Sequence, residues 1–236
     1  MANQYFQFKQ FKIDQEQAAM KVCTDSCIFG AWIEPGEASA VLDIGTGTGV
    51  LSLMLAQRSD ANFDAVEIDE AAAAQAKQNV AQSPWADRIS VHHTSIQEYA
   101  ENTQKTYDLI VTNPPFYSNY LKSEKENVNV AYHSVALPTD ELLEAVKKML
   151  RPSGRLIVLL PPYEAELMRE EALSYGLYTS KILQIKDKET APIFRSVTEF
   201  SFSLAIPIVK ELVIKKEDGS YSNEFAALLK EYYLAL

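Results

Sequence analysis

The sequence predicts an α/β fold, a doubly wound and mostly parallel sheet with helices on both faces. Short apolar segments of strand length alternate with helical segments along most of the chain, which indicates βαβ units. A glycine-rich turn follows an early strand and opens a helix, as in the ligand-binding sheets of this class. Near the C-terminal end, two β-rich runs follow one another without a helix, so we expect an antiparallel hairpin on one edge.

The expected elements follow from hydrophobic periodicity and from turn residues. Residues 5–13 alternate in polarity and predict a short strand or an extended arm, and residues 15–33 contain one or two helical segments. Strands are expected at residues 40–44, 63–68, 89–92, 107–112, 155–160, 177–185 and 197–206. Helices are expected at residues 50–57, 70–82, 140–150 and 164–175, and a short tail at 211–215, a turn and a helix at 223–234 end the chain.

Length and composition are typical of a globular domain. The chain has 236 residues and a mass of 26.4 kDa, and we expect a single domain over 1–236. Its N-terminal arm or helical segment extends to about residue 35, and a C-terminal strand–helix extension begins at about residue 208. No apolar run reaches the ~18 residues of a membrane span, and residues 1–12 lack the apolar core of a signal peptide, so we expect a cytoplasmic protein with no membrane partner. Cys23 and Cys27 are expected to be small buried residues, and the three histidines form no metal-ligand spacing with them.

The charge is acidic overall, with 22 basic and 32 acidic residues and a net charge of −10. This balance disfavours a general binder of polyanions. Between residues 181 and 216, however, seven Lys or Arg residues face four acidic ones, for a local charge of +3. A local basic patch therefore remains compatible with the composition.

The glycine turn predicts a cofactor site. Its sequence is Asp43-Ile44-Gly45-Thr46-Gly47-Thr48-Gly49, directly after a predicted strand and before a helix. The GxGxG spacing differs from the dinucleotide fingerprint, and a carboxylate at this place repels a pyrophosphate but attracts an ammonium group. At the end of the next strand, Glu67 can accept both ribose hydroxyls of an adenosine, whereas Asp69 is expected to cap the following helix.

A second motif, Asn113-Pro114-Pro115-Phe116, follows the strand that we expect beside the first one at the switch point of the sheet. The prolines make the turn rigid. The Asn113 amide oxygen and the Pro114 carbonyl can together accept both hydrogens of a planar amino group, which turns the nitrogen lone pair toward an electrophile. Phe116 can stack on the ring that carries the amine. Catalysis by positioning needs no base with a shifted pKa.

These two motifs together resemble the class I S-adenosylmethionine-dependent methyltransferases that act on adenine N6, cytosine N4 and glutamine amides. The resemblance implies a Rossmann-like sheet of seven strands with one antiparallel strand, S-adenosylhomocysteine as a product, and no metal. It places Gly45, Gly47 and Gly49 at the methionine end of the cofactor, Asp43 at its ammonium group and Glu67 at its ribose. Thr46, Ile68, Ser95 and Asn113 are further expected cofactor contacts, and residues 113–116 hold the target amine.

A narrower resemblance covers residues from about Tyr5 to Leu234. The N-terminal stretch up to Trp32, the segment Gln82-Ser83-Pro84-Trp85 and the C-terminal DGSYSNEFAALLKEYYL stretch resemble the bacterial tRNA1(Val) (adenine(37)-N6)-methyltransferase family. The resemblance implies N6-methyladenosine formation 3′ of the anticodon of valine tRNA by a monomer. It also makes Lys21, Thr24 and Asp25 candidate cofactor contacts. The chain departs from the family at Cys23, Ser95 and Tyr132, where glycine, aspartate and arginine are usual.

A tRNA partner has to be reconciled with the net charge of −10. We expect a basic patch formed by Lys9, Lys12, Lys122, Lys125 and the region 181–216. Tyr5, Phe6, Phe8 and Phe11 could stack on bases, but most of them are expected to pack inside the protein.

Other functions remain open at this point. A glutamine-amide methyltransferase of the release-factor type shares the Asn-Pro-Pro core but has tyrosine in place of Phe116 and a different N-terminal segment. A DNA adenine-N6 methyltransferase would need room for a target-recognition domain. A non-catalytic nucleotide-binding module would not need the Asn113–Phe116 motif that is expected to hold an amino group. A dehydrogenase conflicts with the glycine spacing and with the carboxylate of Asp43.

Overall fold

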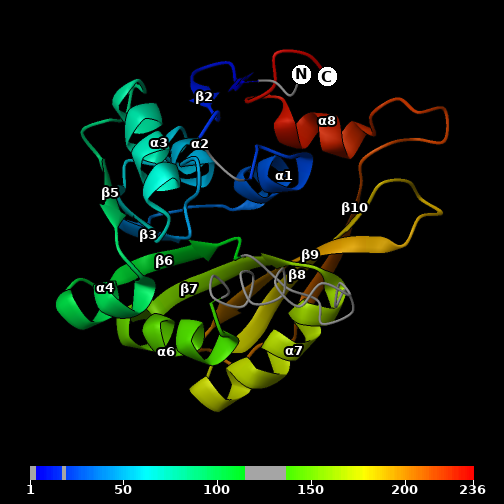
Figure 1. Ribbon diagram of the computed structural model, residues 1–236. Coiled ribbons are helices and arrows are strands. Elements are labelled where there is room, and N and C mark those ends of the chain that lie inside the picture. The colour runs from blue at the N-terminus through cyan, green and yellow to red at the C-terminus, as the bar shows by residue number, and fades with distance from the viewer. Residues whose placement is uncertain (1–3, 18–19, 115–136) are drawn as a thin grey trace, which may run out of the picture.

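The computed structural model describes residues 4–17, 20–114 and 137–236. At its centre is an eight-stranded sheet with the strand order β10-β8-β9-β7-β6-β3-β4-β5 (Figure 1). The strands are β3 (Ala40–Ile44), β4 (Asn62–Glu67), β5 (Ile89–His93), β6 (Tyr107–Thr112), β7 (Leu150–Leu160), β8 (Tyr178–Lys186), β9 (Ile193–Ser201) and β10 (Ile208–Val213). A separate two-stranded sheet pairs β1 (Tyr5–Gln7) with β2 (Lys12–Asp14).

The sheet confirms the doubly wound, mostly parallel fold, but it corrects the strand count and the place of the antiparallel strand. The central sheet has eight strands instead of seven within the described residues, and the antiparallel strand β9 lies inside the sheet instead of at its edge. β9 pairs antiparallel with β7 on one side and with β8 on the other, and β10 adds in parallel outside β8. Hydrophobic patterning predicts that a segment is a strand, but its neighbours are set by contacts between distant segments.

Helices cover both faces of the sheet (Figure 1). One face carries α1 (Thr24–Trp32), α2 (Val50–Ala56), α3 (Glu70–Ala81) and α8 (Asn223–Leu229), and the other carries α4 (Ile96–Asn102), α6 (Thr139–Met149) and α7 (Pro162–Ala172), which the short helix η2 (Leu173–Tyr175) follows. In β7, Ile157 and Leu159 belong to the first core and Leu156 and Val158 to the second. Both faces of this strand are buried, which explains its continuous hydrophobic sequence.

The N-terminal hairpin packs beside the C-terminal end of the chain. The backbone N–H of Lys9 donates to the Tyr232 carbonyl over 2.9 Å, and Figure 1 shows β2 on the same side of the molecule as α8 and the C-terminal end. Phe8 and Phe11 are buried and stacked with ring centroids 4.4 Å apart, whereas Tyr5 is 54% exposed. The expectation that most of these aromatic side chains pack is therefore confirmed.

Two local expectations need correction. Cys27 is buried as predicted, but Cys23 is exposed. Cys23 lies at the N-cap of α1 and not on a buried face of the helix. The last helix ends at Leu229 instead of at residue 234. Its end is followed by backbone turns from Leu229 to Tyr232 and Tyr233, which bring the Tyr232 ring into the core.

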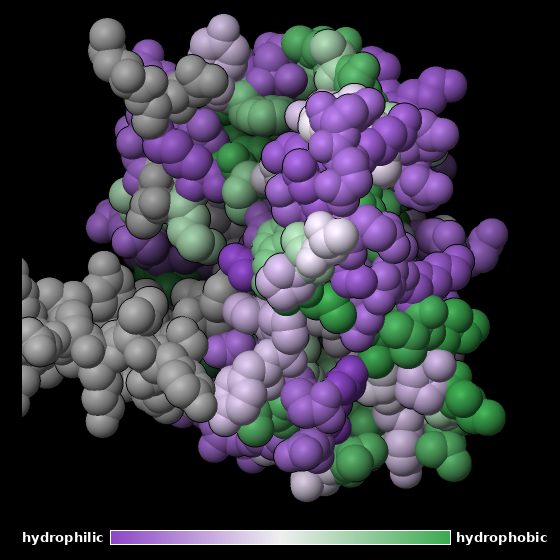
Figure 2. Space-filling view, turned by 90° about the vertical axis from the view of Figure 1, so that its right-hand side faces the viewer, coloured by the Kyte–Doolittle hydropathy of each residue, from purple (hydrophilic) through white to green (hydrophobic). Residues whose placement is uncertain are grey.

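The outer edge of the sheet, formed by β10, has an uneven surface. Figure 2 looks at this side of the molecule: hydrophilic surface covers much of its upper part, and hydrophobic surface gathers at the lower right. Leu204, Ile206, Ile208 and Val209, in the β9–β10 connection and in β10, are exposed apolar side chains. None of the described helices is long and apolar enough to span a membrane.

Candidate functional site

The sheet register brings the two sequence motifs together. Ile44 of β3 lies opposite Thr112 of β6 and opposite Val66 of β4. The Thr112 hydroxyl also donates to the Ile44 carbonyl over 2.9 Å. The glycine turn, Glu67 and Asn113 therefore meet at the carboxyl ends of three adjacent strands, where open α/β sheets bind their ligands.

Asp43 is fully buried at the base of this site, and it is only half satisfied. Its Oδ2 accepts from the Thr46 hydroxyl at 2.6 Å and from the Ser52 hydroxyl at 2.8 Å. Its Oδ1 has no hydrogen-bond partner in the described part of the chain. Burial raises the pKa of the carboxyl to about 6, although the two hydroxyl donors act in the opposite direction. A buried acceptor without a donor is costly, so this oxygen fits an ammonium group of a ligand.

The glycine turn has the backbone conformation that its residue types predict. Gly45 and Gly47 have φ of +70° and +57°, values that side-chain-bearing residues rarely adopt. A Cβ at either position would meet nothing within 4 Å, so the turn leaves open space in front of its backbone. Such a surface fits a ligand that approaches the main chain closely.

Glu67 is held in place by backbone donors. Its Oε2 accepts from the Gly47 N–H at 2.8 Å and its Oε1 from the Asp69 N–H at 3.0 Å. Each oxygen retains a lone pair, which matches two neighbouring ribose hydroxyls. Asp69 caps α3 by accepting from the Ala72 N–H at 2.8 Å, as predicted.

Ile68 and Ser95 lie further along the same edge. Ile68 follows Glu67 and is 57% exposed, which leaves an apolar surface free for a flat ring. Ser95 is the N-cap of α4, and its hydroxyl oxygen accepts from the Glu98 N–H at 3.1 Å. This cap was not predicted, because the sequence analysis expected no helix at residues 96–102.

Three further expected cofactor contacts, Lys21, Thr24 and Asp25, lie just before and at the start of α1. Lys21 and Thr24 are exposed, and the Val22 N–H donates to the Gln15 side chain over 2.9 Å. Asp25 is engaged elsewhere, since Arg195 of β9 donates to its Oδ2 at 2.8 Å. Sequence reasoning missed three polar contacts: the bond of Ser52 to Asp43, the pairing of Arg195 with Asp25, and the bonds of the buried Asn79 amide. The partners of Arg195 and Asn79 are distant in the chain, so local patterns gave no signal for them.

The motif Asn113–Phe116, which is expected to hold the target amine, lies only partly within the described residues. Asn113 is half-buried and Pro114 is buried, directly after β6. Pro115 and Phe116 lie outside the described residues, as do Lys122, Lys125 and Tyr132. The two acceptors expected for the amine, the Asn113 side chain and the Pro114 carbonyl, both belong to described residues beside the glycine turn.

Comparison with known proteins decides the family. The methyltransferase small domain family matches residues 21–174. Over 242 aligned residues, the chain is 43% identical to the tRNA1(Val) (adenine(37)-N6)-methyltransferase of Cytophaga hutchinsonii, with 100% of both chains covered. It is 42% identical to the protein of the same name from Trichodesmium erythraeum, with 99% of both chains covered. The chain belongs to the tRNA1(Val) (adenine(37)-N6)-methyltransferase family.

Solved structures agree on the fold of this family member. A protein described as a predicted O-methyltransferase from Agrobacterium tumefaciens superposes with a TM-score of 0.65 at 15% identity, covering 87% of this chain and 95% of that one. The ribosomal protein L11 methylase of Lactobacillus delbrueckii gives a TM-score of 0.55 at 15% identity, covering 80% and 83%. The expected methyltransferase fold is thereby confirmed.

The basic region predicted for this methyltransferase is partly neutralised by ion pairs. Four of its seven cationic side chains pair with acids: Lys181 with Glu199, Lys186 with Glu211, Arg195 with Asp25 and Lys215 with Asp187. The other three cationic side chains, Lys188, Lys210 and Lys216, form no ion pair with an acid in the described part of the chain, so part of the excess of +3 counted along the sequence remains. The count misses acids such as Asp25, which reach this region from elsewhere in the chain.

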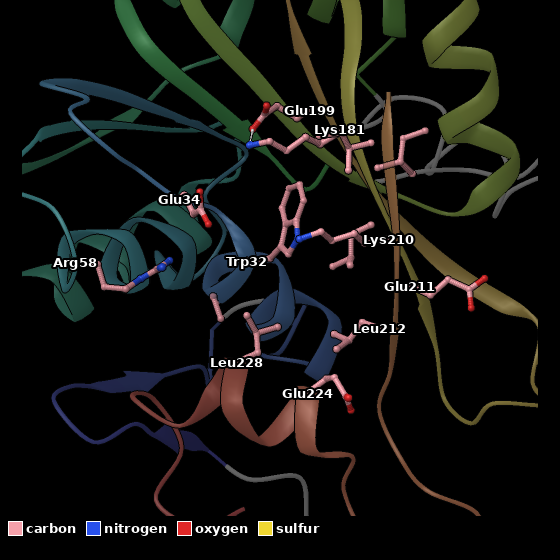
Figure 3. A pocket seen from close by; sticks show the side chains of 14 residues that line it. Trp32, Glu34, Arg58, Lys181, Glu199, Lys210, Glu211, Leu212, Glu224 and Leu228 are labelled. Atoms are coloured by element: carbon pink, nitrogen blue, oxygen red, sulfur yellow. Dashed lines mark hydrogen bonds and ion pairs between the residues drawn. The ribbon is translucent and has the colours of Figure 1, made fainter. Parts of the chain in front are cut away.

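A separate cleft of about 490 Å³ lies between the end of α1, α8 and the strands β8 and β10 (Figure 3). Trp32 and Leu228 form an apolar part of its wall. Glu199 at its far side is paired with Lys181, and with Arg155 at 2.9 Å. None of the residues that line the cleft belongs to the glycine turn, to Glu67 or to Asn113.

Proposed function

We propose that this chain transfers a methyl group from S-adenosylmethionine to the exocyclic N6 of an adenosine in tRNA. The names of its full-length relatives specify adenosine 37 of a valine tRNA, and we propose the same target, which lies 3′ of the anticodon. One observation supports the proposal most strongly. Asp43, which has one oxygen without a donor in the described residues, the open glycine turn and Asn113 lie together at the carboxyl ends of adjacent strands.

The residues of the site fit the cofactor. Asp43 Oδ1 would accept from the ammonium group, the Gly45 and Gly47 backbone would border the methionine end, and Glu67 would accept from the ribose hydroxyls. Thr46 holds Asp43 in place, and Ile68, Ser95, Lys21 and Thr24 would complete the surroundings. S-adenosylmethionine supplies an electrophilic methyl group on a sulfonium sulfur.

Catalysis by the protein would consist of orienting the amine. The Asn113 side-chain oxygen and the Pro114 carbonyl would each accept one N–H of the adenine amino group, which directs the nitrogen lone pair away from these acceptors. Phe116 would stack on the flipped base, and Pro115 would keep the turn rigid. Because orientation carries the reaction, we expect no metal requirement and full activity in the presence of a chelator.

The proposal includes the organisation of the chain as a single methyltransferase domain over 1–236, acting as a cytoplasmic monomer. The shared core of the N-terminal hairpin, α1, α2 and α8 supports a single unit. The residues of the N-terminal arm up to about 35 and of the extension from about 208 would then form part of the same domain.

The test is transfer of labelled methyl groups from S-adenosylmethionine to unmodified total tRNA, followed by nucleoside analysis. We expect N6-methyladenosine, with the label in a valine tRNA. Label in protein instead of tRNA would support the glutamine-amide reaction, and label in DNA the DNA adenine reaction. Absence of label from all three, with binding of S-adenosylhomocysteine retained, would support a non-catalytic binding module.

A further inference from the structure

Asn79 joins the glycine turn to the N-terminal segment through one side chain. It lies in α3 and is 1% exposed. Its Nδ2 donates to the Thr48 carbonyl and to the Asp14 carbonyl, each at 2.9 Å, and its Oδ1 accepts from the Asp14 N–H at 2.9 Å. Both amide hydrogens are thus used, on segments 31 and 65 residues away in the chain.

The first of these bonds fixes the glycine turn. Thr48 lies between Gly47, whose N–H donates to Glu67, and Gly49, the N-cap of α2. A Cβ at Gly49 would lie 3.6 Å from the Cβ of Ala76, so α3 contacts the turn directly. The bond from Asn79 therefore acts on the part of the turn that orients the Glu67 carboxylate.

The other two bonds fix the segment that leads to α1. Asp14 is the last residue of β2, and the next residue, Gln15, is buried and accepts from the Val22 N–H at 2.9 Å. The Gln17 N–H donates to the buried Gln75 of α3 at 3.4 Å. Hydrogen bonds thus connect the glycine turn, through Asn79 and Gln15, with the residues just before α1.

We propose that Asn79 is a positioning residue for the cofactor. It holds the glycine turn and the segment before α1 in one relative arrangement, so that the proposed cofactor contacts on both segments are in place before binding. This inference rests on the proposed cofactor site, and Asn79 itself touches neither cofactor nor target amine. Preorganisation lowers the entropic cost of binding. A change at Asn79 should therefore weaken cofactor affinity and leave the rate of the transfer step nearly unchanged.

The variant Asn79→Asp tests this role. It keeps the size of the side chain and the acceptor for the Asp14 N–H, but it places a carboxylate oxygen against two carbonyl oxygens. We expect the Kd for S-adenosylhomocysteine, measured by calorimetry, to rise ~10-fold or more. The kcat at saturating cofactor should change less than ~3-fold. Hydrogen exchange of the cofactor-free protein should become faster at the Asp14 and Val22 amides than in the wild type.

Two further variants separate positioning from stability. Tyr107→Phe is the matched control, because it removes a buried hydroxyl that donates to Asp64 over 3.0 Å on the other face of the sheet. It should lower thermal stability and leave the Kd unchanged. Gln15→Ala removes a bond in the same segment that Asn79 holds. Because the two residues act on one segment, the double variant Asn79→Asp/Gln15→Ala should raise the Kd by less than the product of the two single effects.

The outcomes are distinguishable. A Kd within about twofold of wild type for both Asn79→Asp and Gln15→Ala overturns the inference while the proposed function stands. Should Asn79→Asp fail to fold, Gln15→Ala decides by the same criterion. Failure of the wild-type chain to bind S-adenosylhomocysteine in the same titration would contradict the proposed function, and the inference with it.

Discussion

Two buried aspartates lie on neighbouring strands, Asp43 in β3 and Asp64 in β4, and the protein satisfies them differently. Asp64 accepts from Lys105 and from the Tyr107 hydroxyl, and its Oδ1 lies 2.7 Å from His92 Nε2. Burial alone would raise the pKa of Asp64, but these partners outweigh it and hold the pKa below its usual value. Burial dominates at Asp43 and raises its pKa to about 6.

The difference separates a carboxylate that supports the fold from one that is available to a ligand. At Asp64 the chain supplies donors from β5, β6 and the segment before β6, so both oxygens are used. At Asp43 the donors Thr46 and Ser52 serve one oxygen only. A perturbed, incompletely satisfied acid at the carboxyl end of a parallel sheet is a candidate functional group.

The largest effect on turnover is expected at Asn113, which lies at the same edge of the sheet as Asp43. Asn113→Ala removes one acceptor for the target amine, so turnover should fall by ~100-fold or more, while the Kd for S-adenosylhomocysteine stays nearly unchanged. Asn102→Ala is the control, because Asn102 is an exposed asparagine of α4 whose side chain donates to the Glu98 carbonyl over 2.9 Å. Equal losses in turnover and cofactor binding at Asn113 would make it a structural residue.

The comparison itself is tested by changing each aspartate to asparagine. Asp43→Asn keeps acceptors for Thr46 and Ser52 but removes the charge, so the Kd for S-adenosylhomocysteine should rise ~10- to 100-fold. Asp64→Asn should leave that Kd unchanged. Calorimetric titration of both variants measures this, and equal effects at the two positions would remove the distinction drawn between them.

A pH series sharpens the same comparison. Asp43 must be ionised to bind an ammonium group, so with a pKa of about 6 the affinity for S-adenosylhomocysteine should fall ~10-fold between pH 7 and pH 5. The folded pKa lies above the unfolded one, so protonation of Asp43 stabilises the cofactor-free protein as pH falls from about 6 to about 4. In Asp43→Asn the affinity should lose most of its pH dependence; a profile like that of the wild type would assign the titration to another group.

The smallest effect concerns stability at Asp64. Its partners are partly exposed, with Lys105 60% and His92 35% exposed at the side chain, so Asp64→Asn should cost about 1–2 kcal/mol in urea unfolding at pH 7. Because the folded pKa is lowered, this contribution is present above the unfolded value of 3.8 and is lost as pH falls below it. The difference from wild type should therefore shrink in acid, and a constant difference would mean that ionisation of Asp64 is not its source.

The amino-acid sequence by itself determined the local features of this protein. The types and spacing of residues 43–49 predicted the glycine turn between a strand and a helix, and Asp69 was predicted to cap α3. The hydrophobic run of β7 and the end of β6 at Thr112 were likewise predicted from their own residues. These features depend on backbone sterics, capping and burial pattern, which act over a few neighbouring residues.

Only the tertiary structure decided which distant groups meet. It placed β9 between β7 and β8, added β10 outside β8, and paired four of the seven cations of the region 181–216 with acids. It also left Asp43 Oδ1 without a donor from any residue that the structure describes, and it brought Asn79 between Thr48 and Asp14. Strand order, ion pairing and hydrogen-bond satisfaction arise from packing of segments far apart in the chain, so local sequence patterns contain no direct signal for them.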